Sequence, residues 1–393
     1  MIIAKIIHTF ATCSENINIM NRKNKSFDRN LPFNQLPLLP PPEEIIDKEV
    51  LIKWGHASRA LAELNKNILR LPNPTMLVNT ISLQEAKSSS EIENIFTTDD
   101  ELYKAISDKV IEENANPNTK EVLRYREALW AGYEAVIKNG KVDTDIVIKV
   151  FQEIKNTNQG IRPPQSMVTI KRGQSEFRAG EIIYTPPRGE GVIESKMDNL
   201  IEFLNDSKTF TLDPLLKMVI AHYQFEAIHP FYDGNGRTGR ILNLLYLISN
   251  GLLTHPVLYL SNYIIKNKDD YYYHLSAVTQ RGSWKNWILF MMEAVENTSL
   301  HTNRLIDEII TQMDASLKYA KDNLKWYNKE INEVLFSQPY IKHKTIGKVI
   351  GRTSRTTITK YLSELCKLQI LSPKQDGKEV YFVNNELIRI LEG

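Results

Sequence analysis

Apolar residues recur at three- and four-residue spacing along most of the chain, which is typical of helices that bury one face. The first such helix begins after Glu43. Its expected apolar face consists of Leu51, Trp54, Ala57, Ala60, Leu61 and Leu64. Further helices are expected over 82–94, from 99 to about 112, and over 120–138, 192–205, 214–228, 271–280 and 285–325. Another follows residue 240, and Pro117-Asn118 is interpreted as a loop. The chain is therefore predicted to be mainly α-helical.

Strand patterns are confined to two places. The segment 162–187 is rich in β-branched and turn residues and predicts a small hairpin. Near the C-terminus, helices over 345–350 and 354–368 flank a turn at 351–353, and a second hairpin follows them. This order resembles a winged helix-turn-helix domain. Its recognition helix would begin with Ser354, Arg355, Thr356, Thr357 and Lys360.

An excess of basic residues is found near the C-terminus. The whole chain carries a formal net charge of +2, but residues 337–380 hold nine basic and three acidic side chains. DNA binding through residues 342–380 is therefore one expectation. Protein contacts or dimerisation through the same domain are the alternative, and the sequence leaves both open.

The chain of 393 residues is long enough for several domains. We expect a flexible N-terminal tail over 1–36, an N-terminal helical segment over 37–115, a central core over 116–300, a helical connector over 301–332 and the winged-helix domain over 333–393. Met20 is an alternative start. Two cysteines, Cys13 and Cys366, fit a reducing compartment and hence the cytoplasm. Apolar runs of membrane-spanning length are lacking, so membrane association is not expected.

A glycine-rich loop carries the strongest chemical pattern. Residues 234–239 match G-x-G-x-x-G, but a helical pattern precedes them, and the acid that a dinucleotide-binding fold places about 20 residues later is missing. The loop still predicts an anion site, because Gly234, Asn235 and Gly236 can point successive backbone N–H groups at one phosphate at the start of a helix. Arg237 and Arg240 follow in the first turn, where they suit an oligophosphate.

Two further residues next to this loop suggest group transfer. Asp233 supplies a carboxylate that suits Mg²⁺ bridging phosphate oxygens. His229 could accept a proton from an incoming hydroxyl group. A phosphate nest, two arginines, a metal carboxylate and a base together predict phosphoryl or nucleotidyl transfer.

The run from His229 to Arg240 resembles the signature of the Fic family, H-P-F-x-D/E-G-N-G-R-x-x-R, and the resemblance extends from about residue 37 to about residue 300. It implies that His229 deprotonates the target hydroxyl, that Asp233 holds Mg²⁺ and that Phe231 anchors the loop in the core. It also implies that Arg237 and the nest of Gly234, Asn235 and Gly236 bind the α- and β-phosphates of ATP. Arg240 would bind the γ-phosphate, and Tyr272 would line the adenine.

The same resemblance implies a helical Fic core with a small β-hairpin flap, and the activity of a protein adenylyltransferase. AMP would pass from ATP to a Ser, Thr or Tyr hydroxyl of a protein docked on the flap at 177–187. The intact Gly-Asn-Gly-Arg run favours nucleotidyl transfer over phosphotransfer. Alternatives are a de-AMPylase in which Glu93 positions water, and a DNA-binding regulator with a nucleotide-sensing core. Self-modification and a homodimer are further expectations.

A second segment fits the family's inhibitory pattern S/T-x-x-x-E-G/N, with Ser89, Glu93 and Asn94 at the defining positions. Composition alone would also allow an ordinary helix here. A helix that delivers the Glu93 carboxylate to Arg240 would form a charge-assisted pair and deny Arg240 to the γ-phosphate. The sequence therefore predicts inhibition in cis.

Overall fold

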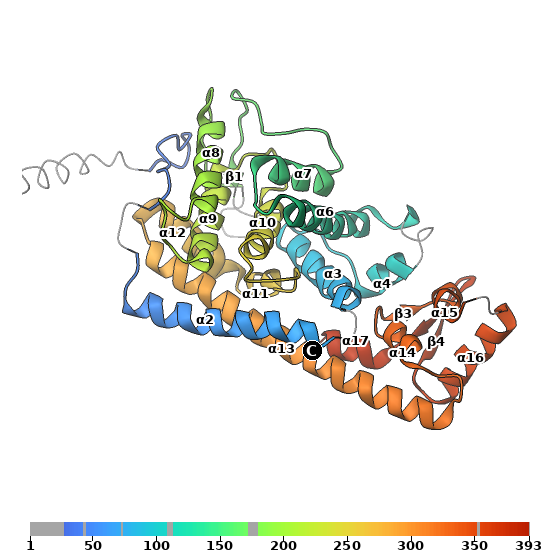
Figure 1. Cartoon of the computed structure of the whole chain (residues 1–393). Helices are drawn as coiled ribbons and strands as arrows, with labels where there is room; N and C mark the ends of the chain where they lie inside the picture. Colours follow the sequence, from blue (N-terminus) through green and yellow to red (C-terminus); the bar gives the residue numbers. More distant parts are fainter. Residues whose placement is uncertain are drawn as a thin grey trace, which may run out of the picture.

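The computed structural model describes residues 27–41, 45–71, 74–107, 113–171, 180–351 and 354–392. The expected N-terminal tail falls largely outside these ranges, as do Phe177 in the predicted flap and the centre of the turn at 351–353. The described chain is mainly helical, with two small antiparallel sheets, as predicted (Figure 1).

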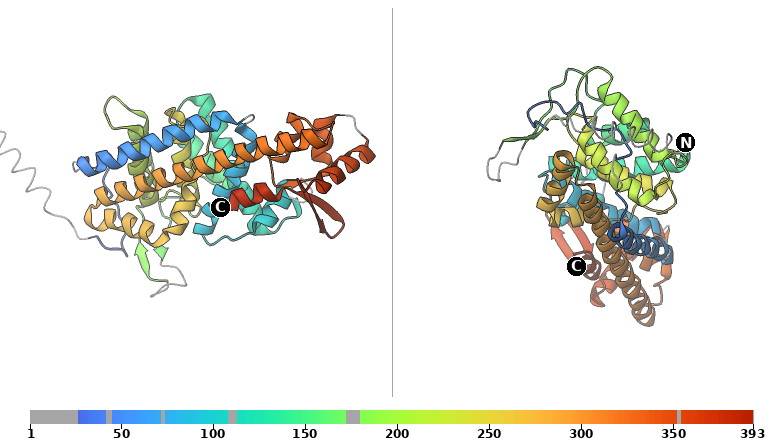
Figure 2. Two further views of the ribbon diagram at one scale, coloured as in Figure 1. Left: turned by 90° about the horizontal axis from the view of Figure 1, so that it is seen from below. Right: turned by 90° about the vertical axis from the view of Figure 1, so that its left-hand side faces the viewer.

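Two long helices form the base of the molecule. Helix α2 (Lys48–Asn67) lies against α13 (Trp284–Asn323), and the two run side by side in both orthogonal views (Figure 2). Asp47 caps α2 by accepting a hydrogen bond from the backbone N–H of Val50, a residue that is buried against this base. Leu51 was predicted on the buried face and is exposed instead, because Val50 takes the core-facing place.

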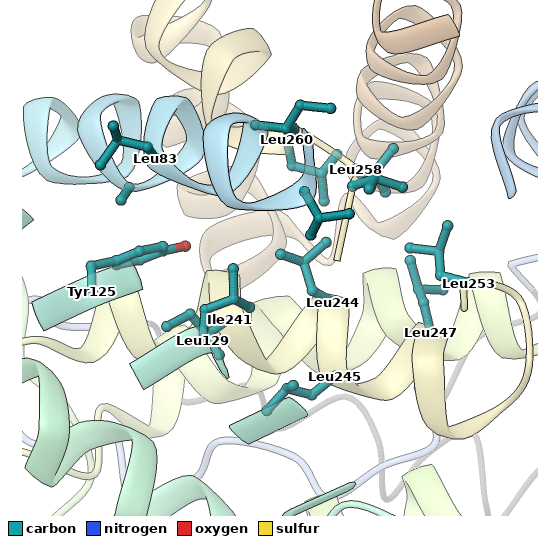
Figure 3. Packing of buried hydrophobic residues seen from close by; sticks show 14 of the residues in the cluster. Leu83, Tyr125, Leu129, Ile241, Leu244, Leu245, Leu247, Leu253, Leu258 and Leu260 are labelled. Atoms are coloured by element: carbon teal, nitrogen blue, oxygen red, sulfur yellow. The ribbon is translucent and has the colours of Figure 1, made fainter. Parts of the chain in front are cut away.

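The centre of the fold is α10 (Asn235–Ser249), which packs against α9 (Pro214–Ile228), α6 (Pro117–Asn139), α7 (Thr144–Lys155) and α3 (Pro74–Ile92). Leu244 of α10 points toward α3, while Leu245 of the same helix lies on its opposite side (Figure 3). Nearly every residue of α9 and α10 is buried, because both helices are apolar around most of their circumference. The glycine loop connects these two buried helices.

The remaining helices cover this centre. The described chain also contains η1 (Ile68–Arg70), α4 (Asp99–Ser107), α8 (Val192–Asn205), α11 (Leu260–Lys266) and α12 (Lys268–Arg281). Strands β1 (Ile170–Lys171) and β2 (Ile182–Tyr184) pair antiparallel and form the predicted hairpin.

Three expectations about helices need correction. Pro117 and Asn118 begin α6 rather than forming a loop, because proline suits the first turn and Asn116 caps it through the N–H of Thr119. Helix α3 begins at Pro74, well before the predicted start at residue 82. Helix α7 was not predicted, although Asp143 caps its first turn.

The C-terminal module follows α13. Helices α14 (Lys329–Leu335), α15 (His343–Ile350) and α16 (Arg355–Lys367) pack with a sheet of β3 (Tyr340–Ile341), β5 (Glu379–Val383) and β4 (Ser372–Asp376), in that order. Ser354 caps α16. The two helices and the β4–β5 hairpin have the order of elements predicted for a winged helix, and α17 (Asn385–Glu392) returns to α13. Helix α13 crosses residue 300 without interruption, so the proposed domain limits stay a prediction.

None of the helices in the described ranges combines the length and the apolar character that crossing a membrane requires.

Candidate functional site

The glycine loop turns sharply between the end of α9 and the start of α10. His229 ends α9 in the left-handed conformation, with φ of 51°, and its N–H still donates to the carbonyl of Phe225. Gly234 precedes α10 with φ of 79°, a conformation in which a side chain would be strained. These two residues place the predicted base and the predicted phosphate nest at facing helix ends.

Asn235 closes the loop. Its Oδ1 accepts a hydrogen bond from the N–H of Phe231 at 2.9 Å, and its Nδ2 donates to the carbonyl of Phe231 at 2.9 Å. The Phe231 ring is fully buried and stacks on Phe151 of α7 with 3.9 Å between ring centroids. The core contact expected of Phe231 is therefore present, and the unpredicted helix α7 provides its partner.

Arg162 holds the other side of the loop. Its buried guanidinium donates from Nε to the carbonyl of His229 at 2.8 Å and from Nη2 to the carbonyl of Pro187 at 2.6 Å. Its backbone N–H donates to the carbonyl of Pro230. This residue therefore connects the loop to the segment that leaves the hairpin. Sequence reasoning did not select it, because no motif in the sequence marks this residue.

The imidazole of His229 is held neutral. Burial, together with the charge of Arg162, lowers the pKa of His229 to about 4. Its Nδ1 is buried and has no hydrogen-bond partner. At neutral pH the ring therefore has the basic form that proton abstraction requires.

Arg240 contacts the predicted inhibitory segment. Its Nη2 lies 2.9 Å from Oε1 of Glu93 and 2.9 Å from the carbonyl of Ser89, and its Nε donates to Oγ of Ser89 at 2.8 Å. The guanidinium is almost completely buried. The predicted Glu93–Arg240 pair is thus present, and Ser89 contributes two of the three hydrogen bonds.

The chain geometry around Glu93 explains the neighbouring residues of the pattern. Helix α3 ends at Ile92, and Glu93 and Asn94 form the turn that follows it; Asn94 adopts φ of 61°, a left-handed conformation that asparagine tolerates better than most residues. Lys268 donates to the carbonyl of Ile92 at 2.8 Å and satisfies the end of α3. A Cβ added at Gly236 would overlap Oε1 of Glu93, so the carboxylate lies directly over the glycine nest.

The other two charged residues of the loop have partners outside it. Nη1 of Arg237 donates to Oε1 of Glu121 at 2.7 Å, and Nζ of Lys155 donates to Oδ2 of Asp233 at 2.6 Å. Lys155 Nζ also lies 3.6 Å from Oε1 of Glu121. Burial acts against ionisation of Asp233, but the hydrogen bond and charge of Lys155 lower the pKa of this carboxyl below its usual value. Glu121 and Lys155 had no motif in the sequence to mark them.

The residues around Asp233 suit Mg²⁺ bound together with a nucleotide. The Asp233 side chain is 69% exposed and is followed by the glycine nest. The described residues contain no cluster of three or more His, Cys, Asp or Glu side chains that could hold a metal ion. Mg²⁺ keeps several waters and is usually held by one or two carboxylates plus substrate phosphates, so a single carboxylate beside a phosphate nest fits this ion.

The tyrosines of α12 divide into different roles. Tyr271 is buried and its hydroxyl lies 3.0 Å from Nε2 of His222 in the core. Tyr272 is exposed, and its ring packs edge-on against Tyr271. Its predicted contact with adenine stays a prediction.

Comparisons with known proteins agree with this geometry. Residues 51–134 match the family described as Fic/DOC family N-terminal, and residues 143–247 match the Fic/DOC family. Residues 310–387 match the family described as protein adenylyltransferase SoFic-like, C-terminal domain. The three matches cover the predicted inhibitory segment, the loop and most of the C-terminal module.

Curated relatives match part of the chain. It is 30% identical over 150 residues to protein adenylyltransferase fic-1 of Caenorhabditis elegans, which is 38% of this chain and 27% of the relative. It is 32% identical over 157 residues to protein adenylyltransferase Fic of Drosophila melanogaster, covering 39% of this chain and 29% of the relative. The chain therefore spans less than a third of the length of these relatives.

A solved structure shares the fold. A Fic family protein from Desulfovibrio desulfuricans G20 aligns with a TM-score of 0.52 at 18% identity, and the alignment covers 88% of this chain and 98% of that protein. At this identity the likeness shows the fold alone.

Proposed function

The chain belongs to the Fic family, and from this premise we propose that it is a protein adenylyltransferase that moves AMP from ATP to a Ser, Thr or Tyr hydroxyl of a target protein. One observation carries the proposal. A neutral imidazole at His229, a glycine nest at the start of α10 and the two arginines of the same turn are held around one loop. This arrangement pairs a base with oxyanion-binding groups.

The base, the glycine nest and the charged residues of the loop each have a part in the proposed reaction. His229 takes the proton of the target hydroxyl, and the nest with Arg237 and Arg240 binds the phosphates. Mg²⁺ held at Asp233 would neutralise phosphate charge during transfer. The role of Arg162 is to hold the carbonyl of His229 and so to fix the position of the ring.

The target protein is proposed to add a strand to the hairpin of β1 and β2, whose strands are short and lie beside the loop. Tyr184 of β2 anchors this hairpin, because its hydroxyl donates to the carbonyl of Ala227 at 2.8 Å. The target hydroxyl would then approach His229 from the hairpin side. Self-modification would use the same path.

We further propose that Glu93 inhibits the reaction in cis. Its carboxylate occupies Arg240 and lies over Gly236, where the phosphates of ATP would bind. A γ-phosphate cannot pair with Arg240 while this carboxylate remains in place. ATP would then bind in a pose that does not align the α-phosphate with the target hydroxyl.

The experiment that tests the function is transfer of label from α-labelled ATP in the presence of Mg²⁺. The full chain carrying Glu93→Gly is incubated with cell lysate, and labelled proteins are identified by mass spectrometry. Label that appears with Glu93→Gly and disappears with Glu93→Gly/His229→Ala supports the proposal. Absence of protein-bound AMP with both proteins contradicts it.

A second candidate is removal of AMP through the same site. Glu93 is partly exposed and its charge acts on His229, so its carboxylate is positioned to orient a water molecule. This activity would require Glu93, whereas transfer would be inhibited by it. Incubating an AMP-modified target with wild type and with Glu93→Gly separates the two.

DNA binding by the C-terminal module is a third proposal. Arg355, Thr356 and Lys360 lie exposed on α16. Arg355→Ala should weaken binding and reduce its salt dependence if these residues contact phosphates. Homodimerisation stays a prediction, which sedimentation of the full chain would test.

A further inference from the structure

Every charged side chain of the glycine loop forms an ion pair with a residue outside the loop. Arg240 pairs with Glu93, Arg237 pairs with Glu121, and Asp233 pairs with Lys155. The pair with Glu93 is the inhibitory contact already described. The other two involve residues of α6 and α7, and no role has yet been assigned to them.

Lys155 occupies the place next to Asp233 that a divalent cation would need. Its Nζ lies 2.6 Å from Oδ2 of Asp233. Its aliphatic stem covers the nest, because a Cβ added at Gly234 would lie 3.2 Å from Cδ of Lys155. Coordination of a cation by this carboxylate and approach of a phosphate to Gly234 would therefore both require Lys155 to move.

Glu121 provides the place to which Lys155 can move. Its Oε1 accepts a hydrogen bond from the buried Arg237 at 2.7 Å and already lies 3.6 Å from Lys155 Nζ. When Arg237 binds phosphate, Glu121 loses Arg237 as its ion-pair partner. When Asp233 binds a metal ion, Lys155 loses Asp233 as its partner. A short movement of Lys155 toward Glu121 then restores an ion pair for both residues.

We propose that Lys155 and Glu121 are positioning residues that exchange partners when a metal–nucleotide complex binds. The pairs Lys155–Asp233 and Arg237–Glu121 are replaced by Lys155–Glu121, while Arg237 turns to phosphate and Asp233 to the metal. The exchange avoids leaving a partly buried charge without a partner, which is costly for a protein. This inference rests on the proposed nucleotide site but not on transfer of AMP.

The exchange is tested by the metal dependence of nucleotide binding, with ADP as the probe. ADP lacks the γ-phosphate and so does not compete directly with Glu93 for Arg240. The affinity of the full-length protein for ADP is measured by calorimetry with excess Mg²⁺ and again with EDTA. The ratio of these two affinities reports how strongly Mg²⁺ and the protein cooperate.

Lys155→Met should raise this ratio about two- to fivefold, because Mg²⁺ then no longer has to break the Lys155–Asp233 pair to reach Asp233. This range corresponds to the contribution of a partly exposed ion pair. Lys155→Arg keeps the cation next to Asp233 and should leave the ratio close to that of wild type. Glu121→Gln should lower the ratio, because the displaced Lys155 then has no carboxylate to move to. A spectroscopic check replaces Mg²⁺ with Mn²⁺ in the presence of ADP. The electron paramagnetic resonance of Mn²⁺ reports how much of the ion is bound, and the variants should rank in the same order as in calorimetry.

Equal ratios in wild type, Lys155→Met and Glu121→Gln, with ADP binding intact, would overturn the partner exchange and leave the proposed function standing. Loss of ADP binding in all proteins, including wild type, would overturn both. Binding of ADP with the expected ratios but without AMP transfer by Glu93→Gly would support the exchange and contradict the proposed function. Neither Lys155 nor Glu121 is among the buried residues, so circular dichroism should show all three variants folded.

Discussion

The contact between Glu93 and Arg240 leads to a quantitative prediction, namely that Glu93→Gly transfers AMP about tenfold faster than wild type. Arg240 is 2% exposed and Glu93 is 34% exposed, with 2.9 Å between Nη2 and Oε1. A hydrogen bond to a charged group contributes about 1.5–3 kcal/mol. Because water screens the partly exposed carboxylate, the lower end of this range applies. About 1.4 kcal/mol corresponds to a tenfold change in an equilibrium, which here is the fraction of sites open to the γ-phosphate.

Glu93→Gly should also make the thermal stability of the protein depend more strongly on bound nucleotide. Without Glu93, the buried guanidinium of Arg240 keeps its hydrogen bonds to Ser89 but loses its ion pair. An uncompensated buried charge destabilises the fold. Glu93→Gly should therefore have a lower Tm than wild type in EDTA and recover more of it when ATP and Mg²⁺ are added. Differential scanning calorimetry measures both effects.

The assay follows label from α-labelled ATP into protein at equal concentrations of wild type, Glu93→Gly and the matched control Glu91→Gly. Glu91 lies in the last turn of α3, two residues before Glu93, and Arg240 pairs with Glu93, so the Glu91 variant introduces a nearby glycine without removing the ion pair of Arg240. Arg240→Ala should not be activated, because it removes the inhibitor's partner and the γ-phosphate ligand together. Equal rates for wild type and Glu93→Gly, or equal activation by Glu91→Gly, would refute the reasoning.

Four further outcomes are expected. His229→Ala should reduce transfer by about 10²–10⁴-fold in a labelled-ATP assay while ADP binding persists, because only the base is removed. Since the pKa of His229 is lowered to about 4, the base is neutral above that value, and transfer should stay level from pH 8 to about pH 5 and decline as pH falls through 4. Phe151→Ala should lower the free energy of unfolding by about 3–5 kcal/mol in a denaturant titration, since it removes the ring under the loop. Asp100→Ala, which removes the partner of Lys374 and Tyr340, should make the β4–β5 hairpin easier to cleave in limited proteolysis.

Local patterns predicted the ends of several helices closely. The prediction for 214–228 coincides with α9, because Asp213 caps the helix and Pro214 occupies its first position. Helix α7 was missed although Ile146, Val150 and Ile154 recur at helical spacing. Its β-branched residues are equally common in strands, so composition gave no clear preference. Pro117 was interpreted as a loop residue because local reasoning does not distinguish a proline before a helix from one at its first position.

The glycine loop could be identified from the sequence because its residues are contiguous. A run of twelve positions contains the proposed base, the proposed phosphate nest and both arginines, and the separate pattern around Glu93 named the partner of Arg240. The partners of the other charges come from distant segments, since Glu121 lies on α6, Lys155 ends α7 and Arg162 follows in a loop. Such contacts depend on how helices pack and not on spacing along the chain. Each of these three residues therefore required the structure.

The charges of the C-terminal module help to distinguish DNA binding from protein contact as its function. The sequence has an excess of basic residues here, but several of these lysines have acidic partners. Lys374 lies against Asp100 of α4, Lys342 lies 2.8 Å from Glu379, and Lys360 lies 3.9 Å from Glu364.

The hairpin of this module, which a DNA-binding winged helix would place against the duplex, is held by α4. Lys374 shares Asp100 with Tyr340, and Asp376 of the same hairpin pairs with Lys104. Helix α4 follows the proposed inhibitory segment after only a few residues, so the hairpin contacts the part of the chain that continues from Glu93. This arrangement favours protein contact as the role of the hairpin. Any DNA contact would then depend on α16, where Arg355 remains exposed at the first helical position.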